Sequence, residues 1–248
     1  MNFRFRFMRY LLLLSLFLLP LMANADSVRV AVAANFASPL RTLVALYQRS
    51  YPQADIQLTV ASTGKLAAQI RQGAPYDIFL AADDRRPLEL AREGWLKPET
   101  VRTYAQGVLV VWTPRPGVPI TPQSLRQGSL HPVALANART APYGQAAQAV
   151  LSALQVPKSV TLVRAENVGQ SYHFAHSGAA AAAFVALSQV LGQGGSQWRV
   201  PTSLYPPILQ QGGLLNDTPG ASQFYDFLFS AAAQQQIEAS GYRVIHAQ

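Results

Sequence analysis

Residues 28–60 read VRVAVAANFASPLRTLVALYQRSYPQADIQLTV, and this stretch decides the fold. Valine alternates with alanine and arginine over 28–33, which predicts a β-strand. A serine-proline pair then starts a helix with leucines at helical spacing, and a tyrosine-proline pair ends it. Alternation over 56–60 predicts a second strand. A strand, a helix and a strand in this order favour an α/β fold with a mostly parallel sheet.

The same rhythm continues along the rest of the chain. In the first half we expect a short helix after the turn at 62–64, a strand over 77–81 and a helix over 88–92. A second unit begins with the apolar strand 108–112. Its further expected elements are strands over 133–136, 159–163 and from Ala182, helices over 144–154 and from Val168, an extended segment over 203–208 and a helix over 221–239. No long linker separates the two units, so a ligand cleft between them is one option.

Residues 1–25 have the features of a secretory signal peptide. Three arginines precede an apolar run over 11–21, and Ala23-Asn24-Ala25 follows as an A-x-A cleavage site. The apolar run is short for a membrane span, so we expect cleavage, with an uncleaved anchor as the alternative. Export excludes nuclear and cytosolic roles.

Composition excludes several classes of site. The chain has no cysteine, which rules out disulfides, a thiol nucleophile and cysteine-ligated metals. Its formal charge of +8 comes from 20 Lys and Arg against 12 Asp and Glu, and the densest basic spot is Arg85-Arg86. The sequence has no basic stripe of the kind that would indicate nucleic-acid binding. The modest positive field fits either an anionic small ligand or ordinary surface charge.

Catalytic motifs are missing as well. The sequence has no G-x-S-x-G elbow and no glycine-rich phosphate loop. His173 and His176 have a spacing that suits a metal, but no carboxylate cluster completes a site, so we interpret them as a surface pair. We interpret Asp83-Asp84 as the N-cap region of a helix and not as a catalytic pair. Nothing nominates a nucleophile, and we expect no enzyme activity.

Four strand-to-helix turns carry small polar residues, at 33–36, 61–64, 141–144 and 166–169. The first N–H groups of each following helix lack intrahelical acceptors and lie at the positive end of the helix dipole. One such turn is ordinary capping. Several turns that meet at one place would form an anion cage of neutral donors. The sequence alone leaves both alternatives open.

Seven blocks in order give the chain a strong resemblance to the periplasmic molybdate-binding proteins of ABC transporters, the ModA type. The blocks are VAANF (32–36), ASTGKLAAQI (61–70), GAPYDIFLAAD (73–83), APYG (141–144), FVALSQV (184–190), YDFL (225–228) and GY (241–242). Together they span nearly all of the chain after residue 27.

The resemblance implies a two-lobed class II periplasmic binding protein fold of the α/β class, with the ligand cleft between the lobes. The last helix would return to the first lobe. We therefore expect residues 26–107 plus 215–248 in lobe 1 and residues 108–214 in lobe 2.

The resemblance also implies which residues bind the oxyanion. Asn35 from the first turn, a hydroxyl of Ser62 or Thr63, and the backbone amides of Tyr143 and Val168 would hold it, without cationic side chains. No cofactor and no direct metal ligand is implied. Two positions depart from the family, since many relatives have Ser or Thr at Ala34 and several have Tyr near Ala186.

The implied function is capture of molybdate, and of tungstate, by a monomer in the periplasm that delivers the anion to an inner-membrane ABC permease. A donor-only site disfavours a protonated oxyanion, whose O–H would lack an acceptor. Sulfate has the same charge and shape, so only its size would exclude it. The alternatives are a binder of sulfate or another tetrahedral oxyanion, an exported enzyme on the same fold, and a sensor that presents its liganded form to a receptor.

Overall fold

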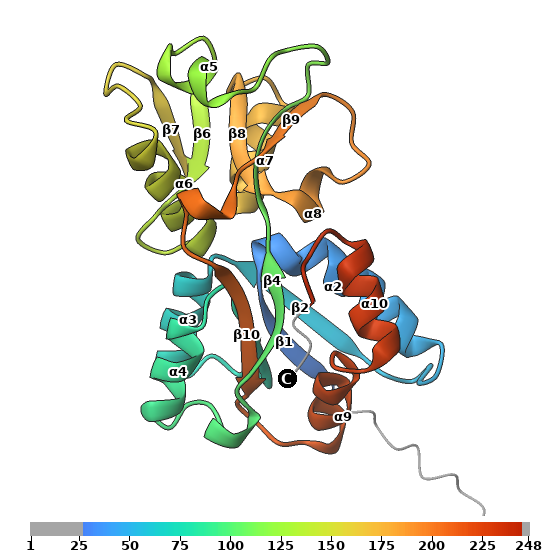
Figure 1. The fold of residues 1–248 in the computed structure, drawn as a ribbon. Helices are drawn as coiled ribbons and strands as arrows, with labels where there is room; N and C mark the ends of the chain where they lie inside the picture. Colours follow the sequence, from blue (N-terminus) through green and yellow to red (C-terminus); the bar gives the residue numbers. More distant parts are fainter. Residues whose placement is uncertain (1–26, 245–248) are drawn as a thin grey trace, which may run out of the picture.

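The computed structural model describes residues 27–244, and the expected signal peptide lies outside them. These residues form two lobes, each with a five-stranded mixed sheet and covering helices (Figure 1). The expected two-lobed α/β architecture is confirmed. We name the lobe that contains Val28 lobe 1 and the other lobe 2. Within the described residues, no helix is long and apolar enough to cross a membrane.

Lobe 1 is built on a sheet with strand order β2-β1-β3-β10-β4. Strand β1 runs parallel to β2 and β3, whereas β10 runs antiparallel to β3 and β4. Its strands are β1 (Val28–Ala33), β2 (Ile56–Ala61), β3 (Ile78–Leu80), β4 (Arg102–Gly107) and β10 (Ile208–Leu214). Its helices are η1 (Ala34–Phe36), α2 (Ala37–Gln48), α3 (Thr63–Arg71), α4 (Arg85–Arg92), η2 (Pro98–Thr100), α9 (Pro219–Phe227) and α10 (Ala231–Ala239).

The β1 strand lies between β2 and β3, and both of its faces are covered. Val30 and Val32 point into a core with α2, α9 and α10, while Ala31 points into a second core with α3 and α4. All three side chains are fully buried. A strand buried on both faces reads as a nearly continuous apolar run, which explains the decisive stretch at 28–33.

A buried carboxylate joins the ends of β1 and β3. Asp77 accepts the backbone N–H of Arg29 at 2.8 Å, the Arg29 guanidinium at 3.2 Å, and the Asn216 amide at 3.1 Å. Burial acts to raise the pKa of Asp77, but the bonds from Arg29 and Asn216 outweigh it, so the pKa lies below its usual value. The ionised carboxylate therefore stabilises the folded state.

We expect Asp77→Asn to lower the free energy of unfolding by about 1.5–3 kcal/mol near pH 7, because it removes charge-assisted bonds to Arg29. A depressed pKa contributes stability that is present above the unfolded pKa and is lost as pH falls through the folded pKa. The gap between variant and wild type should therefore narrow below about pH 4. Urea unfolding at several pH values measures it, and a gap that does not depend on pH would contradict this role.

Lobe 2 has the strand order β7-β6-β8-β5-β9. Strand β6 is parallel to β7 and β8, and β5 is antiparallel to β8 and β9. Its strands are β5 (Leu109–Thr113), β6 (Val133–Ala136), β7 (Leu162–Ala165), β8 (Ala182–Ala186) and β9 (Ser196–Arg199). Its helices are α5 (Pro122–Arg126), α6 (Pro142–Ala153), α7 (Val168–His176), α8 (Leu187–Val190) and η3 (Thr202–Leu204). Every residue of β5, β6 and β8 is buried.

Two segments cross between the lobes. The first runs from β4 to β5, and the second runs from η3 to β10 (Figure 1). Because β10 is paired with β3 and β4, residues 208–214 belong to lobe 1. The expected return to lobe 1 at residue 215 was therefore wrong by one strand. The crossing lies before Ile208. Two consecutive prolines precede this residue, and they have no backbone N–H to donate to a neighbouring strand.

The structure also differs from the expected elements at several places. Strands β4 and β9 were not expected, because short strands with polar and charged residues give weak alternation. Strand β7 begins later than expected, since a turn closed by Val160 N–H to Pro157 O occupies its predicted start. The expected helix over 221–239 is two helices, and the Ser230 side chain caps the second by accepting the N–H of Ala233.

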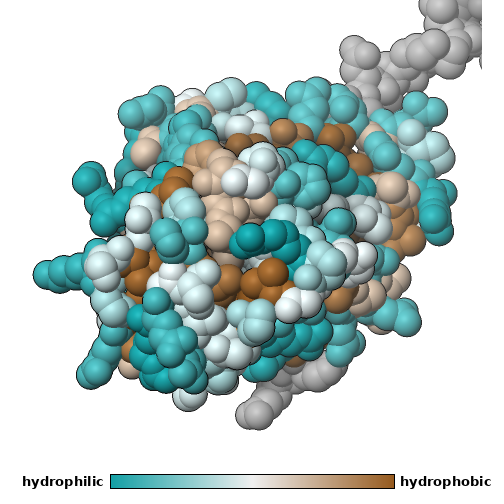
Figure 2. All heavy atoms as spheres, turned by 90° about the horizontal axis from the view of Figure 1, so that it is seen from above, coloured by the Kyte–Doolittle hydropathy of each residue, from teal (hydrophilic) through white to brown (hydrophobic). Residues whose placement is uncertain are grey.

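Figure 2 shows the molecule from the lobe 2 end, with polar side chains around small apolar areas. Among the described residues, the most exposed large apolar side chains are spread along the chain, and none is more than 43% exposed. Residues such as Tyr51, Val60 and Leu162 are thus scattered singly, which is ordinary for a protein surface.

Candidate functional site

The five residues that the sequence singled out lie together. Asn35, Ser62, Thr63, Tyr143 and Val168 all line one small pocket. Lobe 1 supplies the first three and lobe 2 supplies the other two. The remaining lining residues are Ala33, Ala34, Ala82, Ala141, Pro142 and Asn167. No lining residue carries a charged side chain, and the described residues hold no cluster of three His, Cys, Asp or Glu that could bind a metal ion.

The pocket lies where four helix N-termini meet. Helix η1 follows β1, α3 follows β2, α6 follows β6 and α7 follows β7, so the carboxyl ends of the parallel strands direct all four toward it. The convergence that the sequence left open is therefore present. Positive helix ends that share one small cavity favour an anion there.

Three of these four helices lack a capping side chain. The N-cap residues Ala33, Ser62 and Ala141 make no cap bond, whereas the Asn167 side chain accepts the N–H of Gln170. Four of the backbone N–H groups at the pocket have no acceptor within the described residues; these are the amides of Asn35, Thr63, Tyr143 and Val168. Buried backbone donors are nearly always paired, with protein, water or a ligand, so this set is suited to binding an anion.

The two hydroxyls of the second turn differ in their surroundings. Thr63 Oγ1 accepts the backbone N–H of Ala82 at 3.0 Å, which fixes it against lobe 1. Ser62 Oγ is buried without any hydrogen-bond partner, although serine is among the best N-cap residues. Leaving a buried hydroxyl unpaired costs about 1–3 kcal/mol, so its partner is expected from the ligand.

Asn35 has no side-chain donor left for a ligand. Its Nδ2 group donates to Gln210 Oε1 at 2.7 Å and to Tyr242 Oη at 2.9 Å. Its backbone carbonyl oxygen accepts hydrogen bonds from Tyr242 Oη at 2.8 Å and from Ser188 Oγ at 3.0 Å. These bonds tie the first turn to β10, to the C-terminal segment and to lobe 2. The backbone N–H is therefore the only hydrogen-bond donor of Asn35 that is available to the pocket.

The Tyr143 side chain packs against the first crossing segment. Its hydroxyl is buried with no hydrogen bond and packs against Gly107, where an added Cβ would lie 2.2 Å from Tyr143 Oη. Burial raises the pKa of the Tyr143 phenol well above its usual value, so the hydroxyl keeps its proton. The side chain thus fills the space beside the first crossing segment, and the backbone N–H remains the unpaired donor of Tyr143 at the pocket.

We expect Tyr143→Phe to leave the free energy of unfolding unchanged or slightly higher, because the lost hydroxyl has no partner. Gly107→Ala should lower it by about 1–3 kcal/mol through overpacking against Tyr143. Combining the two should recover part of that loss, with a coupling energy of about 0.5–3 kcal/mol in a double-mutant cycle. Chemical denaturation measures all four proteins, and strict additivity would contradict the packing described here.

The other candidates from the sequence do not join the pocket. His176 stacks on Tyr172 at 5.3 Å between ring centroids, and both His173 and His176 are exposed on α7. Asp84 is the N-cap residue of α4, but Asp83 Oδ1 accepts the first-turn N–H of Arg86 at 2.9 Å. The Asp83 carboxylate also pairs with the Arg86 guanidinium. The Asp83 carboxylate is therefore structural.

A wider groove leads from the surface to the pocket. It shares Ala34, Asn35 and Asn167 with the pocket and has walls from α2 of lobe 1 and from α7 and α8 of lobe 2. Arg41 stands on its rim and forms no ion pair among the described residues.

Comparisons with known proteins agree with this geometry. Residues 28–243 match the family described as bacterial extracellular solute-binding protein. The chain is 38% identical to the molybdate-binding protein ModA of Azotobacter vinelandii over 91% of this chain and 93% of that one. It is 38% identical to the molybdate-binding protein ModA of Rhodobacter capsulatus over 90% of this chain and 91% of that one. The solved periplasmic molybdate-binding protein of Azotobacter vinelandii matches with a TM-score of 0.83 and 32% identity, covering 90% of this chain and 100% of that chain.

Proposed function

The chain belongs to the bacterial extracellular solute-binding proteins, in their molybdate-binding ModA group, and we propose that it captures molybdate between its lobes for delivery to an inner-membrane ABC permease. Proteins of this group bind solutes and are not enzymes. The observation that carries the proposal is the convergence of four helix N-termini, three without caps, on a pocket that has no charged lining residue.

A donor-only pocket fits a fully deprotonated tetrahedral dianion. Each hydrogen bond to a charged group contributes about 1.5–3 kcal/mol, so several neutral donors hold a dianion without a countercharge. A protonated oxyanion would bring an O–H group that finds no strong acceptor among these backbone amides. Molybdate carries two negative charges and four acceptor oxygens, and tungstate has the same charge and shape.

We assign the donors one by one. Asn35, Thr63, Tyr143 and Val168 contribute backbone N–H groups, since these lack acceptors within the described residues. Ser62 contributes its hydroxyl, because that oxygen is buried and unpartnered while Thr63 Oγ1 is held by Ala82. Both lobes therefore bind the same anion, and its presence stabilises their closed arrangement.

Thermal unfolding of the protein purified without ligand tests the proposal. Molybdate at about 100 times its Kd adds about 2.7 kcal/mol and should raise Tm by about 5–11 °C. We expect the same for tungstate and no comparable shift for sulfate or phosphate at equal concentration. A shift with sulfate alone would replace the named ligand but keep the site. The absence of any shift, with no binding by calorimetry, would overturn the function.

Location and assembly follow from the same proposal. A cleaved leader and a periplasmic site fit the signal sequence and the periplasmic relative from Azotobacter vinelandii. We propose a monomer, since the exposed apolar side chains of the described residues are scattered. Light scattering at micromolar concentration checks this, and a stable dimer would contradict it.

A further inference from the structure

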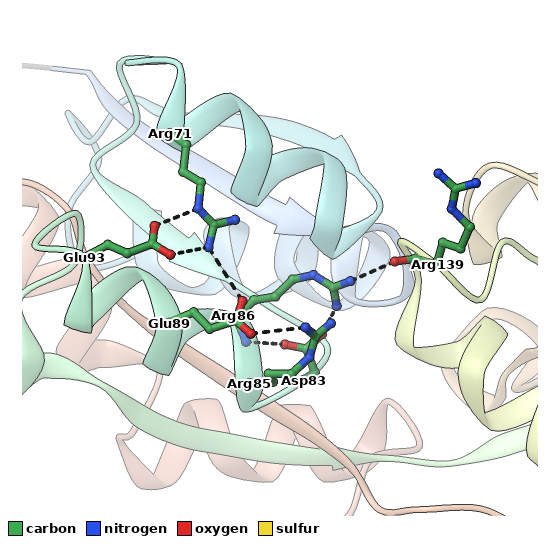
Figure 3. A network of polar contacts seen from close by, with 7 residues as sticks. All are labelled: Arg71, Asp83, Arg85, Arg86, Glu89, Glu93 and Arg139. Atoms are coloured by element: carbon green, nitrogen blue, oxygen red, sulfur yellow. Dashed lines mark hydrogen bonds and ion pairs between the residues drawn. The ribbon is translucent and has the colours of Figure 1, made fainter.

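One buried cation lies beside the pocket without belonging to its lining. Arg86 in the first turn of α4 has a side chain that is 7% exposed. Its guanidinium pairs with Asp83 and donates from Nη2 to the carbonyl oxygen of Arg139 at 3.1 Å. Figure 3 shows this guanidinium reaching from lobe 1 to the backbone of lobe 2, while the Arg139 side chain points away.

The neighbouring carbonyl is held from lobe 1 as well. Gly64 N–H, on the first turn of α3, donates to Thr140 O at 2.8 Å. A Cβ at Gly64 would lie 3.0 Å from the Cα and O atoms of Thr140 and 3.1 Å from Arg86 Nη2. The lobes therefore approach so closely here that only glycine fits without displacement of its neighbours.

The two carbonyls lie next to the ligand turn of lobe 2. Residues 139–140 directly precede Ala141-Pro142-Tyr143, which line the pocket. Holding them fixes the direction of the Tyr143 N–H relative to Ser62 and Thr63. When the lobes separate, both bonds break and their donors and acceptors bind water instead. The two bonds therefore stabilise only the closed arrangement of the lobes.

We propose that Gly64, Arg86 and the carbonyls of Arg139 and Thr140 form an interlobe latch, in which Arg86 is a positioning residue that sets how long the bound anion is retained. The proposal rests on the proposed function for its ligand but not for its geometry. Arg86 is not among the residues that line the pocket, and its guanidinium bonds to the Asp83 carboxylate and to the carbonyl oxygen of Arg139.

Other ion pairs of this region do not share this role. Arg71 pairs with Glu93 and Glu89, and Arg85 pairs with Glu89, but all of these side chains belong to lobe 1 (Figure 3). Lys65 pairs with Glu166 of lobe 2 at 2.7 Å, yet both side chains are half exposed. Exposed pairs contribute little, so Lys65 serves as a matched control that crosses the same gap.

The test measures molybdate release by stopped-flow tryptophan fluorescence in wild type, R86M, the double variant D83N/R86M, G64A and K65M. R86M and G64A should release the anion about tenfold faster or more, with the association rate changed far less. K65M should stay within about threefold of wild type. The double variant removes the unpaired carboxylate, so it should recover the Tm that R86M loses but not the slow release.

A second readout needs no ligand. The chain has no cysteine, so cysteines introduced at exposed Arg92 of lobe 1 and Ser152 of lobe 2 accept a donor and an acceptor dye specifically. R86M and G64A should lower energy transfer between them, and K65M should not. Wild-type release from D83N/R86M, or unchanged transfer in both R86M and G64A, would overturn the latch. Failure of the wild type to bind molybdate would refute the function, and the transfer measurement would then decide the latch alone.

Discussion

Gly144→Ala is expected to lower the Tm of the unliganded protein by about 6–12 °C and to abolish molybdate binding. A Cβ at this position would lie 2.3 Å from Ala136 O and 2.9 Å from Ala138 N, and backbone cannot move aside as a flexible side chain does. Overpacking of this kind costs about 3 kcal/mol or more, and each kcal/mol shifts Tm by about 2–4 °C at this chain length. The N-terminus of α6 would have to shift, and the Tyr143 N–H would shift with it.

Gly194→Ala is the matched control, since no heavy atom lies within 4 Å of its added Cβ and it also belongs to lobe 2. It should change neither Tm nor affinity. Calorimetry of unfolding and of molybdate binding measures both variants. Normal binding by Gly144→Ala would show that the seating of α6 on the end of β6 does not position the ligand turn.

Ser62→Ala is expected to weaken molybdate binding by about 10–150-fold and to leave the unliganded protein as stable as wild type or slightly more stable. The binding loss follows from one hydrogen bond to a charged ligand, about 1.5–3 kcal/mol. The stability result follows because Ser62 Oγ has no partner before the ligand arrives. Titration calorimetry and ligand-free unfolding give the two numbers.

Thr63→Val separates the two hydroxyls. It removes the acceptor of the Ala82 N–H and leaves that buried donor unpaired, so it should cost about 1–3 kcal/mol of stability without ligand. Ser62→Ala should show the opposite pattern. A Thr63→Val protein with intact stability and lost binding, beside a Ser62→Ala protein with normal affinity, would reverse the assignment.

The sequence predicted much of the fold where local pattern and burial agree. The runs at 28–33, 133–136 and from Ala182 became central strands, because a strand covered on both faces needs apolar residues throughout. It did not predict β4. This strand lies at the edge of its sheet, and its polar residues Arg102, Thr103 and Gln106 do not give the apolar pattern of a buried strand. It also misplaced the return at residue 215, since pairing of β10 with β3 and β4 is a long-range event that local pattern does not report.

The sequence selected residues that the structure brings into one pocket, but it did not reveal their contacts. The blocks pointed to Asn35 and Tyr143, yet only the structure shows that the Asn35 amide bonds to Gln210 and Tyr242 and that the Tyr143 phenol packs on Gly107. These partners are up to 207 positions away in the chain. In the sequence, Arg86 stood out only as half of the basic pair Arg85-Arg86. Nothing in the sequence predicted its hydrogen bond to the carbonyl oxygen of Arg139.

The central claim is that a cage of neutral donors between the lobes holds the anion. Anomalous diffraction from a crystal grown with molybdate locates the molybdenum atom directly. We expect one peak, inside the pocket, with oxygens within hydrogen-bond distance of Ser62 Oγ and of the backbone nitrogens of Tyr143 and Val168, and with no cationic side chain in contact. A peak in the outer groove at Arg41, or one with a lysine or arginine bound to the anion, would contradict the account.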